Sequence, residues 1–343
     1  MVKVGVVGLG FMGMTHLRAI LAHANAELVA VSDTVKKRLE GDFEGLQGNL
    51  MAEGEKLDFS SLNTYEEPRD LLDDPEVELV SVCLPTFLHA DYVSDALAKG
   101  KHVLCEKPMG LTEEEVDRMV AAAASSPATL MVAQCIRFWP DYRKAREIVK
   151  SGELGPVRCA RFGRRAALPG WSGWLADESR SGGMILDLSI HDIDFAHHLL
   201  GVPDTIRDVG AKSAESGFDH HLGTLQFGDV AVTIEGGWFF PGEYPFSMSF
   251  DIFCERGLLS FDSGGERPLT VYRPDGTSVV PELHPGDGYD GEIDYLLGCI
   301  ESGRSPDLSP PEESAISVKL ALLSRESREK NGAEIAVPSA WRG

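Results

Sequence analysis

The amino-acid sequence predicts an α/β protein: an N-terminal doubly wound parallel sheet followed by a C-terminal α+β domain with a large, mainly antiparallel open sheet. Three observations support this fold class. Short apolar runs alternate with helical stretches over the first 135 residues, a glycine-rich turn follows the first run, and strand-like runs without intervening helices dominate the later part. Alternation is typical of a parallel sheet covered on both faces, whereas adjacent strands favour antiparallel pairing.

The length and the charge limit what the protein can be. A chain of 343 residues exceeds one ordinary core, so we expect two domains, residues 1–135 and 136–343. The net charge of −22 disfavours binding to nucleic acid and to anionic membranes. No apolar run approaches the roughly 20 residues of a membrane span. The first residues lead directly into a strand and leave no room for an export signal, so we expect a cytoplasmic protein.

The cysteines support a reducing compartment. They are scattered, several lie in apolar strand-like runs, and none shows the CxxC spacing of a zinc or redox site. Free thiols therefore explain them better than disulfides or a metal. The six are Cys83, Cys105, Cys135, Cys159, Cys254 and Cys299.

The elements of the first domain follow from its apolar runs. Strands are expected at residues 2–7, 27–32, 77–84, 102–105 and 129–135, with helices at 16–23, 90–98 and 113–124. Residues 41–61 are polar and contain glycine, which indicates an insertion that interrupts the alternation.

The second domain is predicted to begin with a helix over residues 141–150, and further helices are expected at 184–200 and 309–330. Ser309 can cap the last helix with Pro310 in its first turn, and Asn331-Gly332 can end it. Strands are expected at 157–162, 221–227, 230–238, 246–254 and 257–261.

The turn Gly8-Leu9-Gly10-Phe11-Met12-Gly13 follows a strand and opens a helix, which is the context of a dinucleotide-binding turn. Gly8 suits the tight turn, Gly10 lets the backbone approach a pyrophosphate, and Gly13 allows close packing of helix and strand. The phosphates would bind at the helix N-terminus.

Asp33 lies 20 residues beyond Gly13, at the end of the second strand, where a carboxylate accepts hydrogen bonds from the ribose hydroxyls and repels a 2′-phosphate. This favours NAD over NADP as the cofactor. Lys36, Lys37 and Arg38 follow closely and either soften that repulsion or form a solvated helix start, so NADP stays possible.

Lys107 ends a strand within Glu106-Lys107-Pro108. Ligands of open α/β sheets bind beyond the carboxyl ends of the strands, so a lysine there would stand beside a nicotinamide ring. Pro108 stops a helix from forming through the lysine and allows a cis peptide. A surface charge is the alternative reading of this lysine.

Asp187 and His191 form the second candidate pair, in the segment that begins at Gly182-Gly183. A spacing of four residues places both side chains on one helix face, and Asp194 should follow one turn later. Histidine exchanges protons near neutral pH, and a nearby carboxylate can orient it. A metal site or a structural polar network are alternatives. We expect no metal, because hydride transfer to a nicotinamide needs none.

These segments, together with Pro85-Thr86-Phe87-Leu88-His89, resemble the Gfo/Idh/MocA family, the relatives of glucose–fructose oxidoreductase and inositol dehydrogenase. The resemblance extends over nearly the whole chain. It implies an N-terminal Rossmann domain and a C-terminal α/β domain whose open sheet joins subunits into homodimers or homotetramers. It also implies that Lys107, Asp187 and His191 match the family's catalytic residues. Thr86 stands where relatives often carry asparagine.

The expected contacts with the cofactor follow from the turn, from Asp33 and from this resemblance. They are Gly8, Gly10, Phe11, Met12, Gly13, Asp33, Leu84, Pro85, Thr86, His89, Glu106 and Lys107.

The expected activity is the reversible oxidation of a secondary alcohol on a sugar, sugar acid or cyclitol. His191 would accept the hydroxyl proton, Lys107 would stabilise the developing alkoxide, and Asp187 would orient the site. The run His191-Asp192-Ile193-Asp194 resembles inositol dehydrogenases and favours a cyclitol. Alternatives are a dihydrodiol- or biliverdin-type reductase, a deoxysugar ketoreductase, glycoside cleavage through transient oxidation, and an NAD-sensing module without turnover.

Substrate contacts are the least determined part of the site. Arg137, at the entry to the second domain, and Trp174, before the helix of Asp187, are candidates, as is Trp171. An indole face suits stacking on a sugar, but core packing explains a tryptophan equally well. Arg164 and Arg165 should face opposite sides of their strand, so at most one points inward, and Arg161 is a further candidate for an anionic substrate.

Overall fold

The computed structural model describes residues 1–46, 56–167, 173–213, 217–240, 244–265 and 267–342. They form two compact units, Met1–Cys135 with Gly288–Ala315 and Ile136–Asp287 with Ile316–Gly343. The division expected from the sequence placed all of 136–343 in the second domain. The segment Gly288–Ala315 instead belongs to the first unit, because helix α9 (Gly288–Ser302) packs on helix α1 (Phe11–Ala22).

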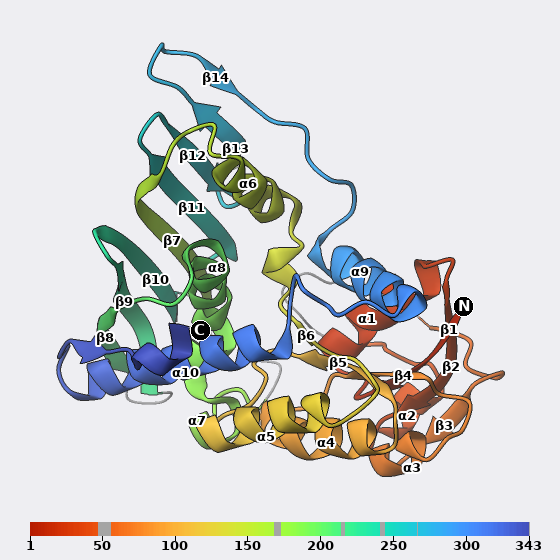
Figure 1. The fold of residues 1–343 in the computed structure, drawn as a ribbon. Coiled ribbons are helices and arrows are strands. Elements are labelled where there is room, and N and C mark those ends of the chain that lie inside the picture. Colours follow the sequence, from red (N-terminus) through yellow and green to blue (C-terminus); the bar gives the residue numbers. More distant parts are fainter. Residues whose placement is uncertain (47–55, 168–172, 214–216, 241–243, 266, 343) are drawn as a thin grey trace. The chain divides into compact units, whose positions relative to one another are not determined.

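The first unit is a doubly wound sheet of six parallel strands in the order β3-β2-β1-β4-β5-β6. Helices α1 and α9 lie on one face and α4 and α5 on the other (Figure 1). This strand order is that of dinucleotide-binding domains. In chain order the elements are β1 (Val2–Val7), α1, β2 (Ala26–Ser32), α2 (Lys36–Leu39), β3 (Asn63–Tyr65), α3 (Pro68–Leu72), β4 (Leu79–Val82), η1 (Thr86–Leu88), α4 (His89–Ala98), β5 (His102–Glu106), α5 (Glu113–Ala124), β6 (Leu130–Ala133) and α9. The turn η2 (Cys135–Arg137) leads from β6 into the second unit.

The second unit contains a nine-stranded sheet in the order β14-β13-β12-β11-β7-β10-β9-β8-β15. Only the pair β7–β10 is parallel among the described pairings, so the expectation of a mainly antiparallel sheet is confirmed. In chain order the elements are α6 (Pro140–Ser151), β7 (Val157–Ala167), α7 (Glu178–Ser181), η3 (Ile185–Ser189), α8 (Ile190–Leu200), β8 (Thr205–Ser213), β9 (Gly217–Phe227), β10 (Val230–Phe240), β11 (Ser247–Cys254), β12 (Gly257–Asp262), β13 (Arg267–Tyr272), β14 (Ser278–Val279), α10 (Pro311–Glu329), β15 (Ile335–Ala336) and η4 (Ser339–Arg342).

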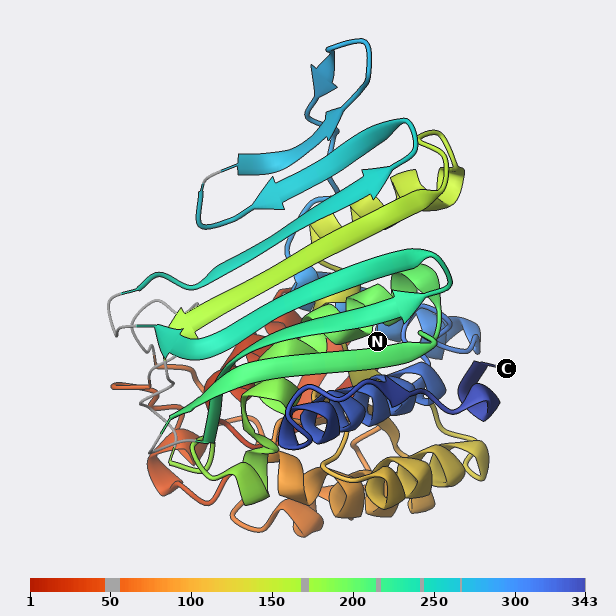
Figure 2. The same cartoon turned by 90° about the vertical axis from the view of Figure 1, so that its left-hand side faces the viewer.

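One face of this large sheet carries the core of the second unit. The aromatic rings of Tyr142, Phe195 and Phe250 pack edge to face there, with centroids 4.9 and 4.8 Å from Tyr142. Figure 2 shows the opposite face toward the viewer, with no described helix of this unit in front of it. Buried side chains alternate with more exposed ones accordingly, as in β11.

Two predicted helix boundaries differ in a way that matters for the site. The helix expected over 184–200 begins with a π-helical segment, η3, and becomes α-helical only at Ile190. Ser309 does not cap α10, because its buried hydroxyl donates to the Val132 carbonyl 2.9 Å away and the helix starts at Pro311. The stop is as predicted: Asn331 and Gly332 adopt positive φ after α10.

The insertion predicted at 41–61 is described only at its ends, since residues 47–55 lie outside the described part of the chain. Phe43 and Phe59, one on each side, are buried and pack edge to face at 6.0 Å between centroids.

All six cysteines are free thiols, four of them buried. Among the described residues, no helix has the length and apolar character needed to cross a membrane.

Candidate active site

The glycine turn after β1 has the shape that its three glycines predict. Gly8 has φ +88°, and a Cβ there would lie 2.6 Å from the Cys83 carbonyl oxygen. A Cβ at Gly13 would lie 1.9 Å from the Gly8 carbonyl oxygen, so helix and turn touch at that point. A Cβ at Gly10 would meet nothing within 4 Å. Two glycines therefore serve packing, and Gly10 leaves the backbone open on the side where a ligand would approach.

The N-terminus of α1 suits an anionic ligand. Gly10 is its N-cap and supplies no side-chain cap, and the first turn contains no acidic residue. The first N–H groups of a helix lack partners within the helix and carry the positive end of its dipole. Together with the open backbone at Gly10, this arrangement fits the pyrophosphate of a dinucleotide.

Asp33 follows β2 and already organises the turn. Its carboxylate accepts hydrogen bonds from the main-chain N–H groups of Leu9 and Val35, each at 2.7 Å. Arg38 forms a longer contact of 3.3 Å with the same carboxylate. A carboxylate has acceptor capacity beyond these contacts, so Asp33 can still accept from ribose hydroxyls. Lys36, Lys37 and Arg38 are the basic residues that could reduce the repulsion of a 2′-phosphate. Of these three, Arg38 contacts the Asp33 carboxylate.

The segment after β4 contains the predicted residues Leu84, Pro85, Thr86 and His89. Thr86 is buried at the start of the 3₁₀ turn η1, and His89 begins α4. The ring of His89 lies between two carbonyl oxygens, 2.7 Å from that of Leu84 and 2.9 Å from that of Pro108. Burial lowers the pKa of His89 below its usual value, although both carbonyls oppose this. His89 thus connects the loop after β4 to the loop after β5.

Lys107 directly follows β5, at the carboxyl end of that strand, as predicted. Its side chain is half-buried, and the Lys107–Pro108 peptide is cis. Glu106 is buried, and one oxygen of its carboxylate accepts the main-chain N–H of Lys107 at 3.0 Å. The other oxygen lies 2.9 Å from Nε2 of His16 on α1. The first unit therefore places Lys107 and the glycine turn at the same edge of its sheet.

Asp187 and His191 are both partly buried residues of the second unit. From Ser181 to Leu199 they are the two residues that are not fully buried. Asp187 lies in η3 and His191 in the first turn of α8. Gly182 and Gly183, both with positive φ, turn the chain into this segment. π-Helical turns are rare and occur frequently at functional sites.

Asp194, expected on the helix face of Asp187 and His191, is placed differently. It is buried and forms a bidentate ion pair with Arg137, with N–O distances of 2.8 and 2.7 Å. Ser317 donates to the same carboxylate at 2.8 Å. Arg137 was predicted to contact substrate, and the structure places its guanidinium on Asp194.

The arginines of β7 alternate as predicted. Arg164 is buried and forms a bidentate pair with Asp192, at 3.0 Å for both contacts. Burial nevertheless raises the pKa of Asp192 above its usual value, and Arg164 opposes that effect. Arg165 is part-exposed on the opposite face and pairs with Glu235. Trp174 is half-buried, whereas Trp171 lies outside the described residues.

Two buried clusters of polar side chains were not predicted from the sequence. One contains Ser189, His221 and Asp208 in the second unit. The other contains His16, Glu106 and Glu292 in the first unit, whose ligand-type atoms all lie within 4.8 Å of one another. Their members are far apart in the sequence, so no spacing reveals them. Buried polar residues within apolar segments, such as His16 in α1, are the only signal.

Comparison with known proteins gives consistent matches. A family model described as an oxidoreductase family with an NAD-binding Rossmann fold matches residues 2–134, and a GFO/IDH/MocA C-terminal domain model matches residues 142–260. Inositol 2-dehydrogenase of Rhizobium meliloti is 30% identical, over 98% of this chain and 99% of that protein. Myo-inositol 2-dehydrogenase of Thermotoga maritima is 26% identical over 96% of both chains.

The fold also matches solved structures. A levoglucosan dehydrogenase in complex with NADH and levoglucosan aligns with a TM-score of 0.84 at 22% identity. The alignment covers 98% of this chain and 100% of that chain. At this level of identity the likeness shows a shared fold.

Proposed function

Because the chain belongs to the GFO/IDH/MocA family of NAD-binding oxidoreductases, we propose that it oxidises a secondary alcohol of a cyclitol, with sugars and sugar acids as the nearest alternatives. One observation carries the proposal. Lys107 and the glycine turn lie at one edge of the NAD-binding sheet, in a chain that aligns along its whole length with an inositol 2-dehydrogenase.

The residues of the first unit fit the cofactor that the family uses. Gly8, Gly10 and Gly13 with the start of α1 would hold the pyrophosphate, and Asp33 would accept the ribose hydroxyls. Leu84, Pro85, Thr86 and His89 would border the nicotinamide half, together with Phe11, Met12, Glu106 and Lys107. When bound, NAD takes up the hydride that leaves the substrate carbon.

The chain's own residues handle the proton and the charge. His191 accepts the proton of the hydroxyl group as general base, which is worth about 10²–10⁴-fold in rate. Lys107 donates a hydrogen bond to the oxygen as its negative charge develops, which contributes roughly 10²–10³-fold. Asp187 orients His191 or a substrate hydroxyl. In the reverse direction Lys107 polarises the carbonyl and His191 returns the proton.

A substrate screen tests the proposal directly. The purified protein is incubated with inositols, aldoses, amino sugars and sugar acids, with NAD and with NADP, and NADH formation is followed by absorbance. We expect turnover with at least one inositol, and faster turnover with NAD than with NADP, because Asp33 repels a 2′-phosphate. Turnover of aldoses alone would contradict the cyclitol assignment.

Variants of the proposed catalytic residues complete the test. Lys107→Met and His191→Ala should each reduce kcat by at least 10²-fold while NADH still binds, as measured by quenching of protein fluorescence. Lys101→Met is the matched control, since Lys101 precedes the same strand at its opposite end. Near-normal turnover in both variants would refute the assigned roles.

We propose further that the protein is a homodimer or homotetramer in the cytoplasm, joined through the outer face of the nine-stranded sheet. Val209 and Leu222 lie opposite each other on neighbouring strands and are 45% and 52% exposed. Phe253 and Tyr272, 42% and 43% exposed, form an apolar row with Leu258 between them. Exposed apolar side chains gathered at two places on one sheet face favour a protein interface there.

Light scattering coupled to gel filtration tests the assembly. The wild type should elute with two or four times the mass of one chain, and Leu222→Asp with Tyr272→Asp should lower that mass. Leu21→Asp, at a similarly exposed leucine of the first unit (53%), should leave it unchanged. A monomeric wild type would refute the interface.

A further inference from the structure

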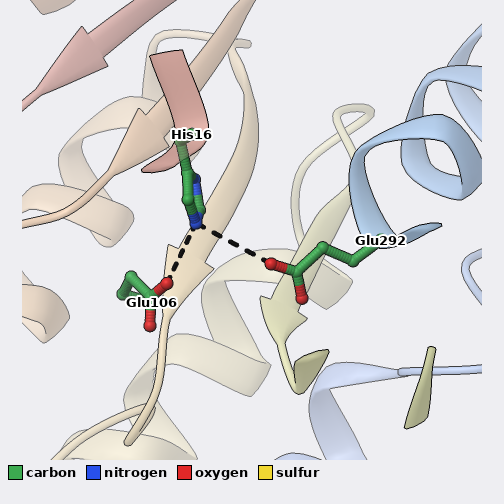
Figure 3. A group of neighbouring side chains, drawn as sticks. All are labelled: His16, Glu106 and Glu292. Atoms are coloured by element: carbon green, nitrogen blue, oxygen red, sulfur yellow. Dashed lines mark hydrogen bonds and ion pairs between the residues drawn. The ribbon is translucent and has the colours of Figure 1, made fainter. Parts of the chain in front are cut away.

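A buried cluster of ionisable side chains includes Glu106, whose carboxylate accepts the main-chain N–H of Lys107. His16 of α1, Glu106 of β5 and Glu292 of α9 converge in the interior of the first unit (Figure 3). Their side chains are 0%, 6% and 0% exposed. Nε2 of His16 lies 2.9 Å from the Glu106 carboxylate and 3.7 Å from that of Glu292. Burying one such group unpaired is costly, so three together require a specific arrangement of charge.

The contacts of His16 define its protonation. A carboxylate accepts hydrogen bonds only, so Nε2 must carry a proton to bond to Glu106. Nδ1 lies 2.7 Å from the hydroxyl of Ser81, which can accept the second ring proton. Burial by itself lowers the pKa of His16, but Cys83 and Glu106 outweigh it and raise that pKa well above the usual value. The groups that face the ring from β4, β5 and α9 are therefore compatible with an imidazolium.

The Glu106 carboxylate connects His16 to the main chain of Lys107. One oxygen bonds to His16, and the other accepts the main-chain N–H of Lys107. The residue proposed to contact the reacting oxygen is thereby tied to α1, the helix whose N-terminus would hold the cofactor phosphates. Charge-assisted hydrogen bonds of this type are short and roughly twice as strong as neutral ones.

We propose that His16, held as an imidazolium between Glu106 and Glu292, is a positioning residue that fixes Lys107 relative to the phosphate-binding end of α1. The role of Lys107 in this statement rests on the proposed function. Glu292 supplies the second negative charge, so the cluster keeps its proton and the Glu106 carboxylate keeps one orientation. A misplacement of about 1 Å at a reacting group can cost 10²-fold in rate, which gives the cluster its importance.

A divalent metal is the competing occupant, because imidazole and carboxylate are zinc ligands. The direct 2.9 Å contact between His16 and Glu106 has the length of a charge-assisted hydrogen bond. Ser81 accounts for the other ring nitrogen. A proton therefore satisfies the same atoms, and elemental analysis of the purified protein separates the two cases.

The first test measures the protonation state of His16 and requires no substrate. NMR spectra of the protein with ¹⁵N-labelled histidine should contain one imidazolium that persists above the pH at which an ordinary histidine loses its proton and that disappears in His16→Gln. In Glu292→Gln the pKa of that imidazolium should fall, because one negative charge is removed. A neutral His16 at pH 7, or one bound metal ion per chain, would overturn the proposal.

The second test reads the effect on Lys107, also without turnover. Exchange of the Lys107 amide proton should be at least tenfold faster in His16→Gln and Glu292→Gln than in the wild type. His23→Gln is the matched control, because His23, directly after α1, pairs with the exposed Asp294 of α9. Unchanged exchange in both cluster variants would refute the positioning role. The isosteric Glu292→Gln serves if His16→Gln fails to fold.

The third test concerns catalysis. With a substrate from the screen, Glu292→Gln should lower kcat at least tenfold and change the dissociation constant for NADH less than twofold. If the wild type turns over no substrate, the proposed function fails, while the NMR and exchange results still decide the proton and the anchorage. A variant with normal kcat would refute the positioning role.

Discussion

Nε2 of His221 lies 2.7 Å from the hydroxyl of Ser189 and so connects strand β9 to the π-helical segment η3. Nδ1 of the same ring lies 2.6 Å from the Asp208 carboxylate, to which Ser324 of α10 also donates. The order of groups is that of a hydrolytic triad, but all three side chains are buried and Ser189 is 0% exposed. No substrate reaches this serine, so the chain of hydrogen bonds holds η3 in place.

Ser189→Ala should therefore affect the pair that flanks it, Asp187 and His191. We expect kcat to fall about tenfold with little change in NADH binding, because the serine touches neither ligand. The protein should also lose about 1–3 kcal/mol of stability, since Nε2 of the buried His221 ring is left without its hydrogen-bond partner. Steady-state kinetics and chemical denaturation measure the two effects. Ser249→Ala, at a half-buried position on the outer side of β11, is the control, and an equal loss of kcat there would contradict the explanation.

The glycine turn allows binding to be separated from folding. Gly10→Ala should leave the stability within about 0.5 kcal/mol, because the added Cβ meets nothing. It should weaken NAD binding at least tenfold by obstructing the approach of the pyrophosphate. Gly13→Ala should instead lower the melting temperature by several degrees, since its Cβ would overlap the Gly8 carbonyl. Thermal unfolding and NADH titration of both variants check this, and a stable Gly13→Ala would contradict the packing argument.

The stability of the protein should depend on pH through His16. Its folded-state pKa is raised above the usual 6.5, so its contribution is complete below about pH 6.5 and is lost as pH rises through the folded-state pKa. The difference in unfolding free energy between wild type and His16→Gln should therefore shrink as pH increases from 6 to 9. Urea denaturation at several pH values measures it. A difference that grows with pH would show that His16 is neutral in the folded protein.

Removing one member of the buried pair Arg164–Asp192 should lower the unfolding free energy strongly, whereas replacing both by apolar residues should lower it little. Arg164→Met leaves a buried carboxylate without its cation and should destabilise the protein by about 3–5 kcal/mol. Replacing both residues, Arg164→Met with Asp192→Leu, should recover most of that loss. Arg161→Met breaks the exposed pair with Asp251 and should cost at most about 1 kcal/mol. Denaturation curves give all three values, and a double variant as unstable as the single one would contradict the expectation that Arg164 mainly neutralises the Asp192 carboxylate.

The local parts of the fold could be predicted from the sequence. Gly8, Gly10, Gly13 and Asp33 lie within one β–α–β unit, where chain-local geometry and spacing determine the structure. The position of Lys107 followed for the same reason, because a strand end is recognisable from its apolar run. The alternation of Arg164 and Arg165 followed from the two-residue period of a strand.

The parts that depend on distant contacts could not be predicted. The π-helical turn of η3 is stabilised by a hydrogen bond from Ser189 to His221, 32 positions later. Helical spacing also predicted that Asp194 lies on the face of Asp187 and His191. Its carboxylate is instead buried and paired with Arg137. Helical periodicity does not contain information about either partner. Ser309 does not cap the helix because its hydroxyl donates a hydrogen bond to a carbonyl oxygen 177 positions away.

The return of Gly288–Ala315 to the first unit has a consequence for how the protein is made. Glu292, which completes the charge cluster around His16, leaves the ribosome only after residues Ile136–Asp287 of the second unit have been synthesised. While these roughly 150 residues are synthesised, α9 is absent from the nascent NAD-binding domain. The surface of α1 that α9 later covers therefore stays exposed during that time.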